Sequence, residues 1–304
     1  MQVSEKPIGI FDSGLGGLTV ARAIARELPN ESITYLGDTK RCPYGTRDQS
    51  EVRLFVRQVG AWFAQRDVKA VIVACNTATA AGLDVLQRAF EVPVLGVIEP
   101  GARAAIQTTR TRRVGVLATQ GTVDSGSYVR AIHALDAGVQ VYQAPAPEFV
   151  EIVEDELARG SHLHQDWMRD RSIFDTPAVN MVARNVVAPL LGKDIDTVVL
   201  GCTHFPLLVD EIRKAIPGGA VLVSSAEEIA SELHETLRRR GELSTREEAS
   251  LGADGEPVYR FATTSDDITE FAVAGRFIFG HALDSIEHVV LDGIEPLPDP
   301  DEEA

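Results

Sequence analysis

The strongest constraint on the fold is a repeated alternation between short apolar runs and amphipathic segments. Most of the apolar runs are rich in valine and isoleucine, as buried parallel strands are; they span residues 8–11, 33–36, 70–74, 94–98, 114–118, 139–142, 197–200 and 220–223. Between most of them, apolar residues recur at spacings of three and four, which predicts helices. Strands that alternate with helices predict an α/β protein with mainly parallel sheets.

The charge of the chain excludes some classes of partner. Among its 304 residues, 45 are acidic and 29 are basic, which gives a net charge of −16. Nucleic-acid backbones and anionic membrane surfaces are bound by clustered lysine and arginine. The apolar runs are also far too short to span a bilayer, and no signal peptide is visible. We therefore expect a cytoplasmic protein without a direct nucleic-acid or membrane partner, with a length that suits about two domains.

Small polar or reactive residues follow the predicted strands repeatedly. This matters because open α/β sheets bind ligands beyond the carboxyl ends of their strands. The polar residues at these positions are also good helix caps, so each of them taken alone leaves both interpretations open. Cysteine is not a capping residue, so Cys75 and Cys202 at two strand ends need another explanation.

The segments around these two cysteines resemble each other. Residues 68–79 and 195–206 each contain an apolar strand, a small residue, a cysteine and a threonine within two positions. The repeat suggests two similar units that each present one thiol. A helix N-terminus favours the thiolate, and two thiols facing one carbon could remove a proton from one side and return one to the other. The alternative is that each cysteine is a small buried hydrophobic residue.

Other motifs are weaker. Gly14, Gly16 and Gly17 resemble a phosphate-binding turn, but Thr19 stands where the dinucleotide pattern needs a third glycine. The turn could still bind a carboxylate through its N–H groups. A cysteine hydrolase that pairs Cys202 with His204 is a further alternative, although it leaves Cys75 without a role. The three cysteines lack metal-site spacing, so we expect no metal site. Two-base chemistry at a carbon also needs no pyridoxal cofactor, so we expect no cofactor.

Four motifs in this order resemble the glutamate racemases of the aspartate/glutamate racemase superfamily. They are DSGLGGLTV at 12–20, PYG at 43–45, ACNTA at 74–78 and GCTH at 201–204. The resemblance covers about residues 7–290. It implies two pseudo-symmetric α/β domains with the active site in the cleft between them. It divides the chain into a first domain at 1–98, completed by 206–290, and a second domain at 99–205.

The resemblance also implies an isomerase that interconverts L- and D-glutamate without a cofactor and supplies D-glutamate for peptidoglycan. Cys75 would deprotonate D-glutamate and Cys202 would deprotonate L-glutamate. Asp12, His204 and Glu154 would assist the thiols, with Glu151 as the alternative alignment to Glu154. The implied substrate-binding residues are Asp12, Ser13, Tyr44, Gly45, Asn76, Thr77, Thr119, Thr122, Thr203 and His204.

Further expectations concern the assembly of the protein, alternative functions and the segments outside the four motifs. The family usually forms dimers, so we expect a homodimer. A racemase for aspartate or another amino acid is an alternative, and so is a regulatory role on DNA gyrase, which some relatives are reported to inhibit. Cys42 matches no catalytic position and is interpreted as structural. The polar stretch 161–180, with His162 and His164, and the acidic tail at 291–304 are additions, and we expect the tail to be disordered.

Overall fold

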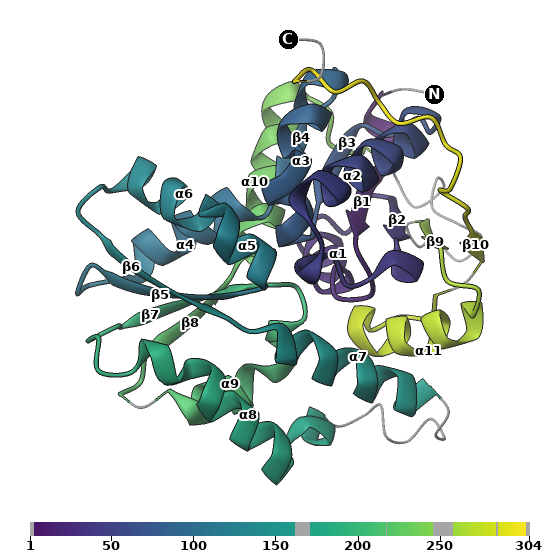
Figure 1. The fold of residues 1–304 in the computed structure, drawn as a ribbon. Coiled ribbons are helices and arrows are strands. Elements are labelled where there is room, and N and C mark those ends of the chain that lie inside the picture. The colour runs from purple at the N-terminus through teal and green to yellow at the C-terminus, as the bar shows by residue number, and fades with distance from the viewer. Residues whose placement is uncertain (1–2, 162–170, 217, 246–257, 284, 302–304) are drawn as a thin grey trace.

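Two parallel sheets organise the chain in the computed structural model, which describes residues 3–161, 171–216, 218–245, 258–283 and 285–301 (Figure 1). The first sheet has the order β10-β9-β2-β1-β3-β4 and the second has the order β6-β5-β7-β8. Every strand pairing in the described part of the chain is parallel. The predicted α/β class with mainly parallel sheets is therefore confirmed.

The bounds of the strands match the predicted apolar runs closely. The first sheet contains β1 (Ile8–Asp12), β2 (Ile33–Gly37), β3 (Ala70–Val73), β4 (Val94–Gly96), β9 (Tyr259–Thr263) and β10 (Ile286–His288). The second sheet contains β5 (Arg113–Ala118), β6 (Gln140–Pro145), β7 (Thr197–Gly201) and β8 (Val221–Ser224). Strands β9 and β10 were not predicted. They are short and carry charged residues, and β10 lies at a sheet edge, so neither gives a continuous apolar run.

The two sheets share one topology. In both, the first strand lies between the second and third strands, and the fourth strand lies outside the third, as β2-β1-β3-β4 and β6-β5-β7-β8. Cys75 follows β3, and Cys202 follows the equivalent strand β7. The similarity of the two cysteine segments therefore reflects equivalent places in two similar sheets.

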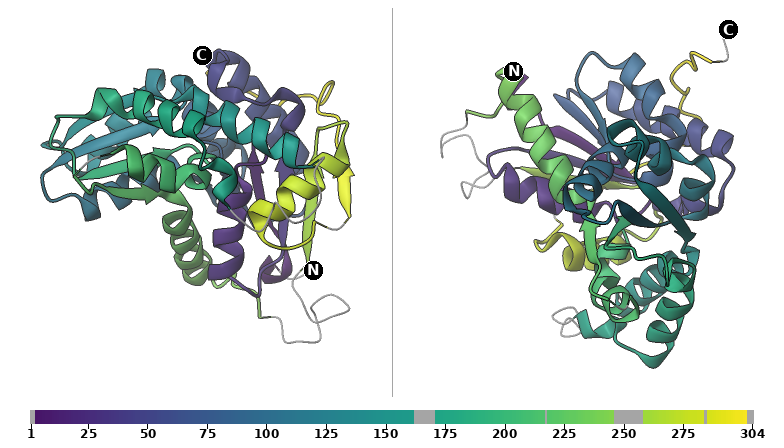
Figure 2. Two further views of the ribbon diagram at one scale, coloured as in Figure 1. Left: turned by 90° about the horizontal axis from the view of Figure 1, so that it is seen from below. Right: turned by 90° about the vertical axis from the view of Figure 1, so that its left-hand side faces the viewer.

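Helices cover both sheets. They are α1 (Leu18–Glu27), α2 (Gln49–Ala64), α3 (Asn76–Ala89), α4 (Ile98–Thr108), α5 (Gln120–Ser125), α6 (Ser127–Leu135), α7 (Pro147–Ser161), α8 (Pro177–Val187), α9 (Val209–Ala215), α10 (Ser225–Arg240) and α11 (Ile268–Phe279). The pairs α2 and α3, α4 and α6, and α8 and α9 pack together. Helix α10 packs on both α1 and α4, so it connects the parts that carry the two sheets; Figure 2 shows it in green beside α1 in purple.

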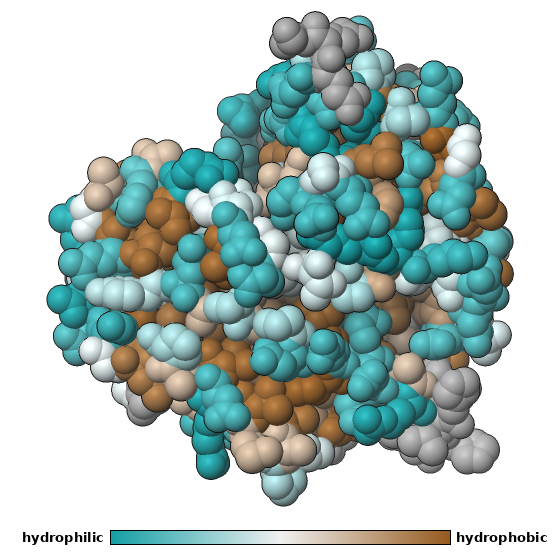
Figure 3. All heavy atoms as spheres, in the orientation of Figure 1, coloured by the Kyte–Doolittle hydropathy of each residue, from teal (hydrophilic) through white to brown (hydrophobic). Residues whose placement is uncertain are grey.

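The surface is mostly polar on the face that Figure 3 shows, with an apolar area in the region of α7, α8 and α9. Among the side chains of α8, Met181 is apolar and exposed. Within the described ranges, no helix is long and apolar enough to cross a membrane.

The structure corrects two predicted boundaries. The second domain was predicted to end at residue 205, but β8 (Val221–Ser224) still belongs to the second sheet. The chain comes back to the first part of the molecule only with α10, which packs on α1. The tail was predicted to be disordered, but the structure describes it as far as Asp301. Asp299 is buried and accepts two hydrogen bonds from the Arg53 guanidinium on α2, at 2.7 and 2.8 Å, and Leu297 packs beside Gly60. His162 and His164 lie outside the described residues.

Candidate active site

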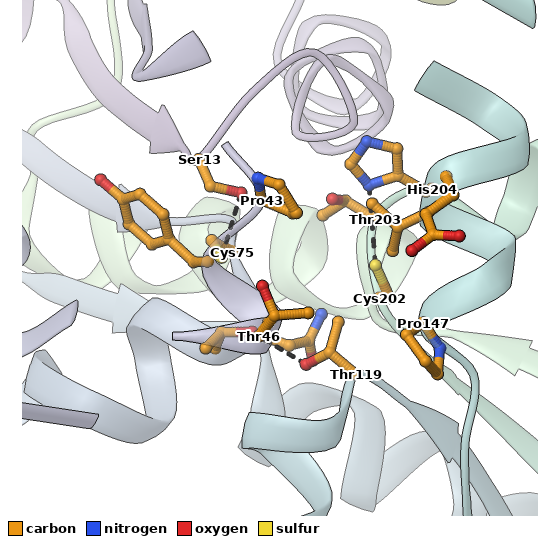
Figure 4. Close-up of a pocket in the computed structure, with 15 residues that line it drawn as sticks. Ser13, Pro43, Thr46, Cys75, Thr119, Pro147, Cys202, Thr203 and His204 are labelled. Atoms are coloured by element: carbon orange, nitrogen blue, oxygen red, sulfur yellow. Dashed lines mark hydrogen bonds between the residues drawn. The ribbon is translucent and has the colours of Figure 1, made fainter. Parts of the chain in front are cut away.

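A pocket lies where the carboxyl ends of β1, β3, β5 and β7 come together. It is lined by Ser13, Pro43, Tyr44, Gly45, Thr46, Cys75, Asn76, Thr77, Thr119, Pro147, Val150, Glu151, Cys202, Thr203 and His204. Figure 4 shows Cys75 beside Ser13 on one side, and Cys202 beside Thr203 and His204 on the other. The two predicted thiols therefore line one pocket from elements of different sheets.

Cys75 lies between the end of β3 and the start of α3. Its Sγ accepts the backbone N–H of Ala78 at 3.4 Å, so this cysteine does serve as the N-cap of α3, contrary to the usual preference. The thiol also lies 3.7 Å from Ser13 Oγ. Burial raises the pKa of Cys75 to about 12, and the charge of Asp12 adds to this rise, while the contacts with Ala78 and Ser13 oppose it.

Cys202 is connected to a histidine and a carboxylate. Its Sγ lies 3.6 Å from Nδ1 of His204, and Nε2 of the same ring lies 2.5 Å from Oε1 of Glu154 on α7. Burial disfavours the charged imidazole, but the contacts with Cys202 and Glu154 outweigh burial and hold the pKa of His204 well above its ordinary value. The His204 ring therefore connects the Cys202 thiol to the Glu154 carboxylate and is placed to exchange a proton with that thiol.

Asp12 lies behind the pocket lining and contacts both halves of the site. Its carboxylate accepts the Gly14 N–H at 3.0 Å and the Thr203 hydroxyl at 3.4 Å. Burial raises the pKa of Asp12, while the positive charge of His204 and the Gly14 N–H oppose the rise. Gly16 allows the loop after β1 to approach closely, because a Cβ there would lie 2.5 Å from Thr203 Oγ1 and 2.6 Å from His204 Nδ1.

Three threonine hydroxyls form a chain on the floor of the site. Thr77 Oγ1 lies 2.9 Å from Thr119 Oγ1 and 3.4 Å from Thr122 Oγ1, and Thr119 donates to Thr122 at 2.9 Å. Thr77 and Thr119 line the pocket, whereas Thr122 is fully buried behind them. Beside them, Nδ2 of Asn76 is buried without a hydrogen-bond partner among the described residues. A ligand carboxylate would supply the missing acceptor.

The PYG segment contributes backbone more than side chain. The Tyr44 hydroxyl donates to Asp38, and its ring packs on Phe55, so that hydroxyl is already engaged. Gly45 lies against the Thr119 side chain, where a Cβ would come within 2.6 Å of Thr119 Cβ. The segment therefore closes the pocket against the loop after β5.

The predicted site residues fall into two groups. Ten line the pocket, namely Ser13, Tyr44, Gly45, Cys75, Asn76, Thr77, Thr119, Cys202, Thr203 and His204. Asp12, Glu154 and Thr122 instead contact residues that do. Of the two glutamates weighed for α7, Glu154 holds His204, while Glu151 lines the pocket.

Sequence reasoning missed Pro43, Thr46, Pro147, Val150 and, as a lining residue, Glu151. Pro43 and Thr46 could have been inferred, because they flank the predicted residues Tyr44 and Gly45. The other three lie in the first turns of α7, where no motif in the sequence marks them.

Cys42 is only partly buried, and its Sγ lies 3.9 Å from the same Glu154 oxygen that contacts His204. Within the described ranges, no group of three or more histidine, cysteine or acidic residues is placed to hold a metal ion.

This arrangement supports proton transfer at a carbon. Two buried thiols enter one pocket from different sheets, and each has its own polar neighbours, Ser13 for Cys75 and His204 for Cys202. The remaining lining supplies hydroxyl and amide donors suited to carboxylates. A small carboxylic acid with an acidifiable C–H bond is the ligand class that fits these groups.

Comparison with known proteins agrees with this chemistry. The family model of Asp/Glu/Hydantoin racemase matches residues 8–233. A glutamate racemase of Corynebacterium diphtheriae is 41% identical over 279 residues, covering 92% of this chain and 96% of that protein. A glutamate racemase structure from Bacillus anthracis has a TM-score of 0.83 at 40% identity, covering 95% of this chain and 98% of that one.

A glutamate racemase from Francisella tularensis, solved in complex with D-glutamate, has a TM-score of 0.82 at 30% identity and covers 95% of this chain and 99% of its own. The family-model match at residues 8–233 includes all the residues that line the pocket. The chain therefore belongs to the Asp/Glu/Hydantoin racemase family.

Proposed function

We propose that this protein is a glutamate racemase, an isomerase that interconverts L- and D-glutamate without a cofactor by means of two thiols. The observation that carries the proposal is the placement of Cys75 and Cys202 at equivalent strand ends of two similar sheets, lining one pocket. The relatives at about 40% identity are named glutamate racemases, which supports the same substrate.

In the L-to-D direction, the Cys202 thiolate takes the α-proton of L-glutamate and becomes a thiol. The electron pair of the broken C–H bond stays on the α-carbon as a carbanion. The Cys75 thiol then gives its proton to the opposite face, so the carbon is inverted and Cys75 becomes the thiolate. The reverse direction begins with the Cys75 thiolate and D-glutamate, and the number of protons is conserved in both directions.

The surroundings of the two thiols suit these roles. The raised pKa of Cys75 suits a proton donor, and the His204 ring lies 3.6 Å from the Cys202 Sγ, where it can exchange a proton with that thiol. His204 contacts Glu154, and Asp12 contacts Thr203 from behind the pocket lining. We assign to these two contacts the role of orienting the donors around the substrate. Fixed hydroxyl and amide donors stabilise the developing negative charge because they need no reorganisation during the reaction.

The substrate is a dicarboxylate with net negative charge in a protein of net charge −16. We assign its carboxylates to neutral donors on Ser13, Asn76, Thr77, Thr119 and Thr203, because the described residues that line the pocket include no lysine or arginine. We also propose that the enzyme acts in the cytoplasm as a homodimer and supplies D-glutamate for peptidoglycan.

Exchange of the α-proton tests the proposal. Purified protein given L-glutamate in deuterated water, without added pyridoxal phosphate, is expected to form α-deuterated D-glutamate, as followed by NMR and chiral chromatography. Cys75→Ala and Cys202→Ala should each abolish racemisation, whereas the matched control Cys42→Ala should retain it. Full racemisation by either of the first two variants would refute the two-thiol mechanism, and faster turnover of aspartate would refute the substrate assignment.

A further inference from the structure

Tyr128 on α6 is a fully buried side chain that contacts the chain next to both cysteines. Its hydroxyl donates to Oδ1 of Asn76 at 2.8 Å, and Asn76 directly follows Cys75. Its ring lies against Gly201, where a Cβ would come within 2.9 Å of the ring atom Cε2, and Gly201 directly precedes Cys202. One rigid ring therefore lies between the two strand ends that carry the thiols.

The hydrogen bond from Tyr128 determines which way the Asn76 amide faces. Because Oδ1 accepts the hydroxyl, the NH₂ group of the same amide is directed elsewhere, and its nitrogen is buried without a partner among the described residues. Asn76 also lines the pocket. A buried donor without an acceptor is costly unless a ligand completes it, so the substrate carboxylate is its expected partner.

The space around the ring leaves little freedom. A Cβ at Gly101 on α4 would lie 3.0 Å from the Tyr128 hydroxyl, and a Cβ at Gly201 would also lie 2.9 Å from the carbonyl oxygen of Leu117. Burial raises the pKa of Tyr128, and the nearby Cys202 adds to this, so the hydroxyl remains a proton donor over the working pH range. The ring is therefore held by glycine backbone on two sides.

We propose that Tyr128 is a positioning residue for the racemase reaction, acting through both of its ends. Its hydroxyl aligns the Asn76 amide toward the substrate carboxylate, and its ring sets the position of Gly201 and therefore of the Cys202 thiol relative to Cys75. This inference rests on the proposed function. The two ends of the Tyr128 side chain have different effects: the hydroxyl affects substrate binding, and the ring affects the geometry of proton transfer.

Two substitutions separate these effects. Tyr128→Phe keeps the ring, and it should raise KM for both enantiomers about threefold to tenfold, the effect of one lost hydrogen bond, with kcat within about twofold of the wild type. Tyr128→Leu removes the ring, and it should lower kcat at least tenfold, because small displacements of reacting groups are costly. Tyr142→Phe and Tyr142→Leu are the matched controls, since that hydroxyl donates to Gln140 on β6, outside the pocket lining.

A double-mutant cycle distinguishes positioning from a general structural role. If the hydroxyl acts through Asn76, then Tyr128→Phe has no further effect on KM in an Asn76→Ala background. An unchanged KM in Tyr128→Phe, or an equal effect in both backgrounds, overturns the assignment of the hydroxyl. This comparison remains decisive even if Tyr128→Leu fails to fold, and a folded Tyr128→Leu with wild-type kcat overturns the assignment of the ring.

Calorimetric titration with D-glutamate provides a readout that does not depend on turnover. A weaker affinity in Tyr128→Phe supports the inference even if the wild-type protein binds glutamate without racemising it, in which case the proposed function alone fails. Equal affinities in the variant and the wild type overturn the inference while racemisation by the wild type still supports the proposed function. A wild-type protein that neither binds nor racemises glutamate overturns both.

Discussion

The environment of Cys75 predicts an unusual pH dependence for its chemical reactivity. Burial and the charge of Asp12 raise the pKa of this thiol from an ordinary value of 9.0 to about 12. A difference of about 3 in pKa corresponds to about 4 kcal/mol of preference for the neutral thiol. At pH 8 the thiolate fraction falls from about one in ten to about one in ten thousand, so alkylation should be about a thousandfold slower than for an ordinary thiol.

The assay is alkylation by iodoacetamide between pH 7 and 10, with each cysteine followed by peptide mass spectrometry and glutathione as the reference thiol. The rate at Cys75 should rise about tenfold per pH unit throughout this range, because only the thiolate reacts. Restricted access to the pocket lowers the rate equally at every pH and leaves this slope unchanged. A rate at Cys75 that levels off below pH 9 would refute the reasoning.

Two substitutions with opposite expected signs identify the cause. Asp12→Asn removes a charge that raises the pKa of Cys75, so alkylation at pH 8 should become faster although racemisation falls. Ser13→Ala removes a contact that lowers the same pKa, so alkylation should become slower. Changes of the same sign in both variants would indicate altered access to the pocket instead of altered electrostatics.

Three further predictions concern the surroundings of the site and the tail. Glu154→Gln removes a partner that holds the pKa of His204 high, so the basic limb of the pH–rate profile should shift to lower pH. An unshifted profile would contradict the role of Glu154. Gly16→Ala places a methyl group against Thr203 and His204, so we expect a cost of about 1–3 kcal/mol in urea unfolding together with reduced kcat; wild-type values for both would exclude the close packing. Arg53 lowers the pKa of Asp299 to about 2 from 3.8, so the stabilisation is complete above about pH 4 and is lost as the pH falls toward about 2. In Asp299→Asn the free energy of unfolding should therefore depend less on pH in that range. An unchanged pH dependence would show that the contact between Arg53 and Asp299 contributes nothing to stability.

Much of the fold could be predicted because buried parallel strands leave a direct signal in the sequence. The runs before Asp12, Cys75, Thr119 and Cys202 are continuous and apolar, and all of them are strands with the expected residues at their carboxyl ends. The edge strand β10 and the ordered tail were not recognised. In β10 exposed polar residues interrupt the pattern, and in the tail the buried Asp299 is paired with Arg53, which lies 246 residues earlier in the chain.

The sequence alone singled out Cys75 and Cys202 as candidates for the chemistry, because two cysteines in matching contexts are a local pattern. The tertiary structure decided what each of them contacts. Glu154 reaches His204 across 50 positions, and Tyr128 reaches Asn76 across 52, through helices whose relative placement depends on the packing of the two sheets. Hydrogen bonds and burial of this kind set the charge of a thiol and the direction of an amide. They depend on distances in space, which spacing along the chain does not specify.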